Sequence, residues 1–332
     1  MELPDPGQGT VSVRNLTKHF GAVRAVQDLS FDVRPGRVTG FLGPNGSGKT
    51  TTLRLLLGLA SPTSGTATIS GRPYARIEKP LREVGAALEA TSFHPGRTGL
   101  DHLRTYAPYT GSDDARCLAL LEQVGLGQAA RRRVAGYSLG MRQRLALATT
   151  LLGDPQVLLL DEPSNGLDPE GIRWLRGFLR HLAGQGKTVL VSSHQLSEVQ
   201  QSVDDVVIIA AGRLIHASSM DELSTLASTT IQVVSPDATG LATLIATQGW
   251  TARQPAVAPA EGRAVNAVSA VDAVKKATTV ELDDVTTAEF GSAAFAAGLE
   301  IHTLMDKSEG LEDIFLRMIA SDSTTDPEGA QR

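Results

Sequence analysis

Gly43-Pro44-Asn45-Gly46-Ser47-Gly48-Lys49-Thr50 is the stretch of sequence that decides the fold. Residues 37–42 before this octet predict a short buried strand, and the leucine-rich run 51–58 after it predicts a helix. Where a glycine-rich loop joins a strand to a helix N-terminus, backbone N–H groups converge on an anion, and Lys49 adds a full positive charge. The octet therefore predicts a nucleotide phosphate site in which the Thr50 hydroxyl binds magnesium. A chance glycine-rich turn is the alternative, and both flanks disfavour it.

Two adjacent carboxylates, Asp161 and Glu162, form the second informative feature. They follow the wholly apolar run 157–160, which is typical of a central parallel strand covered by helices on both faces. At the end of such a strand Asp161 can hold magnesium opposite Thr50, and Glu162 can polarise a water molecule. Two solvated acids closing a strand are the alternative, which the neighbouring phosphate loop makes less favourable.

The third motif is Tyr137-Ser138-Leu139-Gly140-Met141-Arg142-Gln143-Arg144, which opens a predicted helix running through Leu152. Ser138 suits the N-cap of that helix. With all three motifs in this order, the chain resembles the nucleotide-binding subunit of ATP-binding cassette (ABC) transporters, whose signature loop is ordinarily Leu-Ser-Gly-Gly-Gln. The resemblance covers about residues 10–225. It implies an α/β P-loop NTPase cassette with a mixed sheet core and a helical signature subdomain at about 90–150.

The resemblance also implies the site residues. Residues 164–168 match the D-loop, His194 after the apolar run 188–193 matches the switch histidine, and Phe20 matches the aromatic residue that stacks on adenine. Taken singly, a histidine after a strand or a phenylalanine is more often structural. The implied catalytic residues are Lys49, Glu162 and His194, and the implied magnesium ligands are Thr50, Asp161 and Glu89. The implied nucleotide-binding residues are Phe20, Gly43, Pro44, Asn45, Gly46, Ser47, Gly48, Lys49, Thr50, Thr51, Ser138, Gly140 and Asp168.

A signature loop implies a partner subunit. In the family two cassettes pack head to tail, and each ATP lies between the phosphate loop of one and the signature loop of the other. The resemblance therefore implies a nucleotide-dependent homodimer in which the Ser138 hydroxyl and the Gly140 N–H reach the γ-phosphate. Lys49 and magnesium would offset the phosphate charge, Glu162 would orient or deprotonate the attacking water, and His194 would hold the γ-phosphate or that water.

Two departures from the family pattern refine the expectation. Leu139 and Met141 stand where the commoner signature has glycine and glutamine, and Glu89 stands at the usual Q-loop glutamine. Ser138 and Gly140 keep the phosphate-facing pair, and a carboxylate at Glu89 can still bind magnesium or water. This combination resembles the subgroup that includes bacitracin-resistance, lantibiotic-immunity and related drug-export ATPases.

Composition limits the class of protein. The 332 residues leave room for two domains, and the net charge of −5 disfavours a general nucleic-acid binder. No run approaches the roughly 18 consecutive apolar residues of a membrane span, and the first residues lack a signal-peptide pattern. We therefore expect a cytoplasmic subunit that attaches to the inner face of the cell membrane through an integral membrane permease. The single cysteine, Cys117, excludes an internal disulfide and is expected to be inert and partly buried on a helix.

The C-terminal third shows a different pattern. We expect the cassette to occupy residues 1–225, a small α+β accessory domain residues 226–320, and a disordered tail residues 321–332. The accessory domain is expected to contain strands at 229–234, 279–283 and 299–304, and helices at 241–248, 287–298 and 311–319.

Two functions from different classes fit the sequence. One is the energy-coupling subunit of an exporter of drugs, peptide antibiotics or lipids. The other is a soluble cassette ATPase that acts on ribosomes, DNA or another macromolecular complex. A single ATPase unit, one cysteine and no sustained heptads favour the exporter.

Overall fold

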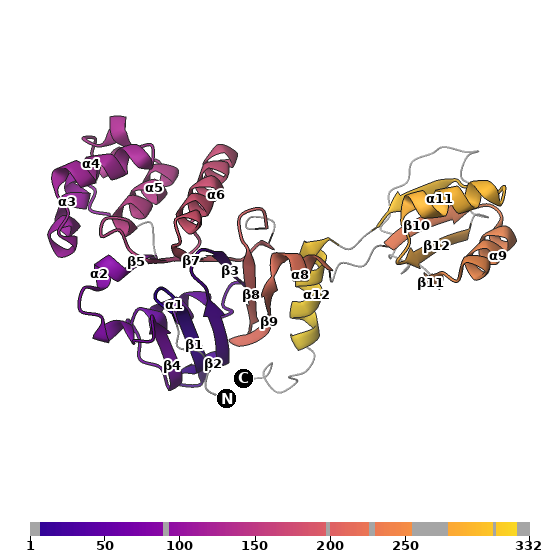
Figure 1. Ribbon diagram of the computed structural model, residues 1–332, viewed down its shortest axis with the longest axis horizontal. Coiled ribbons are helices and arrows are strands. Elements are labelled where there is room, and N and C mark those ends of the chain that lie inside the picture. The colour runs from indigo at the N-terminus through magenta and orange to yellow at the C-terminus, as the bar shows by residue number, and fades with distance from the viewer. Residues whose placement is uncertain are drawn as a thin grey trace. The chain divides into compact units, whose positions relative to one another are not determined.

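The computed structural model of the chain describes residues 7–88, 93–196, 200–225, 230–253, 278–307 and 310–323 (Figure 1). These residues form two compact units. The large unit contains the described residues up to Glu222 together with those from Phe315 onward, and the small unit spans Leu223–Ile314. The small unit is therefore an interruption in the chain of the large unit. The expected domain limits at 225 and 320 remain a proposal.

A six-stranded sheet forms the centre of the large unit. Its strands, in spatial order, are β5 (Val84–Ala87), β6 (Val157–Leu160), β7 (Thr188–Ser193), β3 (Val38–Leu42), β8 (Asp205–Ala210) and β9 (Arg213–Ser219). The first five run parallel, and β9 pairs antiparallel with β8. Every residue of β3, β6, β7 and β8 is buried, as an apolar run in a parallel sheet requires. The carboxyl ends of β3, β6 and β7 consequently meet at one edge.

A second, antiparallel sheet packs against this centre. Its order is β2 (Val23–Val33), β1 (Val11–Phe20) and β4 (Ser64–Ile69). Phe31 of β2 and Phe41 of β3 stack with ring centroids 5.2 Å apart, and both lie in the core shared by the two sheets and helix α1 (Lys49–Leu56). This packing fixes the phosphate loop, which joins β3 to α1.

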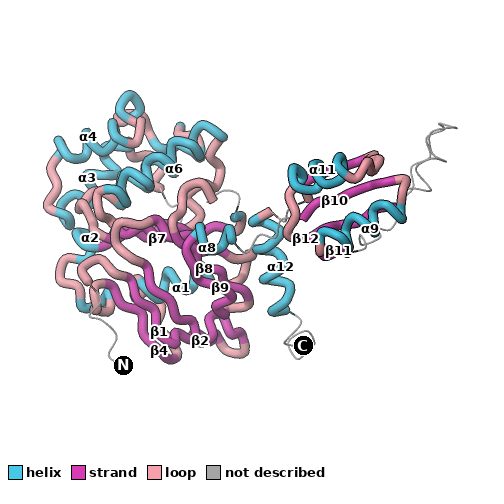
Figure 2. The backbone as a smooth tube through the Cα atoms, turned by 45° about the vertical axis from the view of Figure 1, so that its right-hand side comes forward, coloured by secondary structure: helices cyan, strands magenta, loops and turns pink. Residues whose placement is uncertain are grey.

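Helices cover the other side of the central sheet (Figure 2). Of these, α6 (Pro169–Gly184) contacts β7 and β3, α5 (Leu139–Thr150) contacts β5, and α3 (Gly99–Thr110) and α4 (Asp114–Gln123) pack on α5. Shorter elements are α2 (Pro80–Glu83), α8 (Met220–Thr225) and 3₁₀ turns at Tyr74–Arg76, Gly127–Ala129 and Val134–Gly136. The side chains of Thr98, Asp113, Ser138 and Asp168 accept N–H bonds at the starts of α3, α4, α5 and α6. Cys117 on α4 is fully buried, which corrects the expectation of partial burial.

The small unit has the element order of a split βαβ fold. It contains β10 (Thr230–Ser235), α9 (Ala238–Gln248), β11 (Thr251–Arg253), β12 (Thr278–Asp283), α11 (Thr287–Ala296) and β13 (Thr303–Asp306). The sheet order is β11-β12-β10-β13, all antiparallel. Ile231, Val233 and Phe290 lie in its core. The first and last strands are neighbours, and the Lys307 N–H donates to the Thr230 carbonyl at 2.7 Å.

The structure corrects two sequence expectations in this region and adds one strand. The strand expected at 299–304 lies at Thr303–Asp306, because Leu299 and Ile301 pack on the core from the connection that follows α11 rather than from a paired strand. Strand β11 was not expected, since its three residues are exposed and carry no apolar pattern. Helix α12 (Leu311–Ser323) extends past the expected end at 319 into the predicted tail. Residues 324–332 of that tail lie outside the described residues.

Within the described ranges, no helix is both long enough and apolar enough to cross a membrane.

Candidate functional site

The phosphate loop is held by its glycines and by Lys49. Gly48 adopts a left-handed conformation with φ 104°, and a Cβ at that position would lie 2.5 Å from the Ala25 carbonyl oxygen. Only glycine fits there without moving the backbone. Lys49 begins α1 and has 6% of its side chain exposed, and its ammonium donates to the carbonyls of Gly43 at 2.6 Å and Pro44 at 3.3 Å. Burial lowers the pKa of Lys49, and the nearby Glu162 carboxylate partly opposes that shift.

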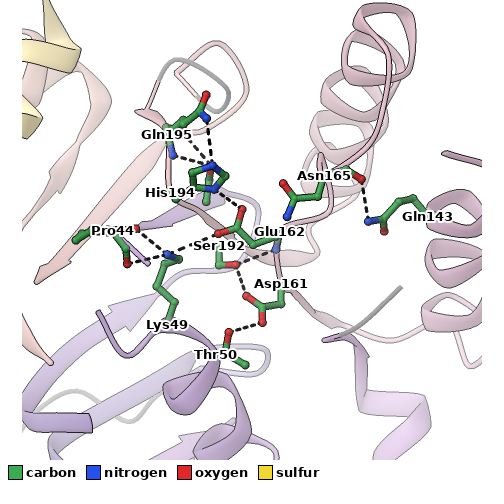
Figure 3. A network of polar contacts seen from close by, with 12 residues as sticks. Pro44, Lys49, Thr50, Gln143, Asp161, Glu162, Asn165, Ser192, His194 and Gln195 are labelled. Carbon is green, nitrogen blue, oxygen red and sulfur yellow. Dashed lines mark hydrogen bonds and ion pairs between the residues drawn. The ribbon is translucent and has the colours of Figure 1, made fainter. Parts of the chain in front are cut away.

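Thr50 and Asp161 fit a magnesium ion. The Thr50 hydroxyl donates to Asp161 Oδ2 at 2.7 Å, and the Ser192 hydroxyl donates to Asp161 Oδ1 (Figure 3). A hydroxyl beside a carboxylate supplies the hard oxygen donors that magnesium prefers, with the remaining positions left to water and phosphate. The described residues hold no group of three or more His, Cys, Asp or Glu side chains suited to a metal. Glu89, the third expected ligand, lies outside the described residues.

Glu162 lies between a cation and an imidazole. One carboxylate oxygen is 3.6 Å from Lys49 Nζ and the other is 2.8 Å from His194 Nδ1. A carboxylate only accepts, so His194 Nδ1 carries the hydrogen, and His194 Nε2 can accept from the Gln195 amide at 3.1 Å. The Glu162 backbone is left-handed, with φ 48°, and its N–H donates to the Ser192 hydroxyl at 2.9 Å. The carboxylate is therefore held in orientation by both its backbone and its neighbours.

Ser192 and Gln195 are site residues that the sequence expectations missed. Ser192 lies in β7 beside the end of β6, where its single hydroxyl contacts both carboxylate residues. The available signal was a pair of serines closing an otherwise apolar strand. Arg24 and Gln27 also line the cleft of about 520 Å³ that contains residues 45–51, Glu162 and His194.

The remaining predicted residues lie outside that cleft. Phe20 ends β1 with 53% of its surface exposed, and Lys18 Nζ lies 4.7 Å from its ring centroid. The Ser138 hydroxyl accepts the Met141 N–H as the cap of α5, and Gly140 lies in the first turn of that helix. Asp168 caps α6 by accepting the Gly171 N–H at 2.7 Å. The structure thus gathers Lys49, Thr50, Glu162 and His194 in one cleft and joins Asp161 to it through the Thr50 hydroxyl, whereas Ser138, Gly140 and Asp168 do not line that cleft.

Comparisons with known proteins point to one family. Residues 26–165 match the family model described as ABC transporter. The chain is 41% identical over 216 residues to the bacitracin transport ATP-binding protein BcrA of Bacillus licheniformis. That match covers 64% of this chain and 71% of the relative. It is 36% identical over 211 residues to the lantibiotic transport ATP-binding protein SrtF of Streptococcus pyogenes. That match covers 64% of this chain and 91% of the relative.

Solved structures give the same picture. An ATP-binding subunit of an ABC transporter matches at 27% identity with a TM-score of 0.59, over 65% of this chain and 92% of the other. A dimeric cassette in a post-hydrolysis state with ADP and Pi matches at 23% identity with a TM-score of 0.58, over 63% of this chain and 98% of the other. At that lower identity the second match concerns the fold alone.

Proposed function

This chain belongs to the ABC transporter family as an ATP-binding, ATP-hydrolysing subunit, and from that premise we propose that it drives the export of a drug, a peptide antibiotic or a lipid. The relatives named for bacitracin and lantibiotic transport support a peptide antibiotic as the substrate class. The confirmed cassette fold and the cleft at the ends of β3, β6 and β7 support the role in energy coupling.

The observation that carries the mechanism is the placement of Glu162 between Lys49 and His194. When ATP is bound, the water oxygen attacks the γ-phosphorus, a water proton passes to the Glu162 carboxylate, and the bond from the γ-phosphorus to the bridging oxygen breaks to leave ADP and phosphate. Lys49 neutralises charge on the phosphates, and His194 orients Glu162 through the 2.8 Å contact. Magnesium held by Thr50 and Asp161 would polarise the phosphate oxygens. Glu89 remains a proposed additional ligand.

A homodimer completes the proposed site. Ser138 and Gly140 lie at the start of α5, away from the cleft formed by residues 45–51 of the same chain. In a two-fold pair of cassettes, these residues would contact the nucleotide of the partner subunit. Phe20, with its exposed ring, would stack on adenine, and Asp168 would contribute at the interface from the N-terminus of α6.

A groove of about 260 Å³ supports docking of a membrane permease. Apolar residues of β5 line it on one side, and Phe93, His102 and Tyr106 line it from α3 and the segment before α3. The Phe93 and His102 rings lie 4.8 Å apart edge to face. We assign this groove to a short apolar helix of the permease, which would hold the chain at the inner face of the cell membrane.

The proposal is tested on purified protein in lipid vesicles, with and without any multispan membrane protein that a neighbouring gene encodes. Phe93→Ala should leave ATP hydrolysis by the isolated subunit unchanged but reduce its stimulation by the permease and the efflux of a fluorescent peptide antibiotic. Tyr109→Ala is the matched control, because this α3 side chain is 75% exposed and does not line the groove. Equal losses with and without the permease would refute the docking role. Absence of any stimulating membrane protein would favour the alternative of a soluble cassette ATPase.

A further inference from the structure

The first turn of α5 packs directly on the D-loop of the same chain. Gly166 is left-handed, with φ 74°, and a Cβ at this glycine would overlap Leu139 Cδ2 and lie 2.6 Å from Leu139 Cγ. The leucine side chain therefore occupies the space that a side chain at position 166 would need. A second close approach lies beside it, because a Cβ at Gly140 would be 3.3 Å from Leu167 Cδ2.

A hydrogen bond joins the same two segments. The Gln143 amide donates to the Asn165 carbonyl at 3.2 Å, and Gln143 is buried (Figure 3). Residues 139, 140 and 143 share one face of the helix by their spacing. Three successive D-loop residues, 165 to 167, thus meet that face.

The D-loop is also tied to Glu162. The Asn165 N–H donates to the Glu162 carbonyl and the Leu167 N–H donates to the Ser164 carbonyl, both at 3.1 Å. Asp168 then caps α6. These consecutive hydrogen-bonded turns make the connection between Gly166 and Glu162 rigid. A displacement of Gly166 should therefore also shift the backbone that orients the Glu162 carboxylate.

Leu139 has no role in the core. It is 44% exposed at the start of α5, so its removal should cost little stability. Its contact with Gly166 gives a physical reason for a leucine at this position and for a glycine opposite it.

We propose that Leu139 is a positioning residue, which fixes the D-loop through Gly166 and thereby sets the place of the Glu162 carboxylate. The proposal rests on the proposed catalytic role of Glu162. In the proposed dimer, Ser138 of this chain would bind the ATP of the partner subunit. Glu162 would act on the ATP bound to its own chain. The Leu139–Gly166 contact would therefore link the signature loop that serves one nucleotide to the carboxylate that hydrolyses the other.

A double-mutant cycle on the full chain tests the contact. Gly166→Ala should lower kcat roughly tenfold or more with KM unchanged, since misplacing a catalytic group by about 1 Å can cost on the order of a hundredfold. Leu139→Ala should lower kcat several-fold. The double variant should recover part of that loss, because Leu139 Cβ would lie 3.5 Å from the new Cβ, an ordinary contact, although alanine at φ 74° stays strained.

Controls separate this proposal from its premise. Leu118→Ala removes a leucine of similar exposure from α4 and should leave kcat unchanged. Thermal unfolding of each variant measures the folded fraction, and Leu139→Ala alone still tests the proposal if Gly166→Ala unfolds. Additive losses in the cycle, or an unchanged kcat in Leu139→Ala, would overturn the positioning role. Glu162→Gln is assayed in parallel, since full activity in that variant would instead remove the catalytic role on which the inference depends.

Discussion

Replacing Glu162 with glutamine separates ATP binding from ATP hydrolysis. Glutamine keeps the shape of the side chain and can still accept from His194 Nδ1, which lies 2.8 Å from the carboxylate. The backbone bond to the Ser192 hydroxyl does not depend on the side chain and should persist. The variant loses only the negative charge and the ability to take a proton from water.

The structure sets the size of the effect. A general base contributes about 10²- to 10⁴-fold, so hydrolysis should slow by that factor, equivalent to about 3 to 5 kcal/mol in the barrier. The carboxylate lies 3.6 Å from Lys49 Nζ, where two unit charges attract by about 4 to 5 kcal/mol at an effective dielectric constant of about 20, before desolvation. Removing that competing anion leaves Lys49 free for the phosphates. ATP affinity should therefore be equal to that of wild type or higher.

Two assays check this prediction. Phosphate release gives the hydrolysis rate, and equilibrium binding of a fluorescent ATP analogue gives the affinity. With ATP and magnesium, the variant should also elute as a dimer on size exclusion, because the nucleotide between subunits is no longer consumed. Glu78→Gln, at an exposed position outside the cleft, controls for the loss of a charge. Hydrolysis by Glu162→Gln at the wild-type rate would show that Glu162 is not the catalytic carboxylate.

Three further predictions concern other buried groups. Lys49→Ala should abolish most ATP binding in the same fluorescence assay, since it removes the cation held over the loop, and unaltered affinity would refute that role. Burial lowers the pKa of His102 to about 4, so below pH 6.5 the unfolded chain binds a proton at this histidine that the folded chain does not. The stability that the neutral His102 gives above pH 6.5 is therefore lost as the pH falls towards 4. Between pH 7 and pH 5, the free energy of unfolding measured in urea should fall by about 2 kcal/mol more for wild type than for His102→Phe. Equal losses in the two proteins would contradict this prediction. Burial raises the pKa of the Cys117 thiol, so a thiol reagent at pH 8 should label the unfolded chain but not the native one.

Local spacing explains why much of the site could be predicted. The octet, the two carboxylates and His194 each follow a buried strand, and parallel strands bring their carboxyl ends to one edge. The family and the ATPase activity expected from these motifs are confirmed, whereas the individual residue roles remain predictions.

Contacts between distant segments could not be predicted in the same way. The Ser192 hydroxyl reaches residues about thirty positions away, and the overlap of Leu139 with the space above Gly166 exists only once α5 lies on the D-loop. Sequence alone marked Leu139 as a departure from the family pattern without a reason for it. Leu299 and Ile301 led to a strand prediction that was wrong. Their alternating apolar pattern is typical of a strand, but they pack on the core from a connection between α11 and β13.

The neighbouring ends of the small unit give it the character of a replaceable module. Its first strand begins at Thr230 and its last is followed by Lys307, and a 2.7 Å hydrogen bond joins these two points. A unit whose own two ends are hydrogen-bonded neighbours can be inserted, enlarged or exchanged during evolution without disturbing its own fold. Related cassettes could thus acquire different accessory modules at this position while conserving the hydrolytic apparatus, and a protein engineer could graft a sensor domain there by the same route.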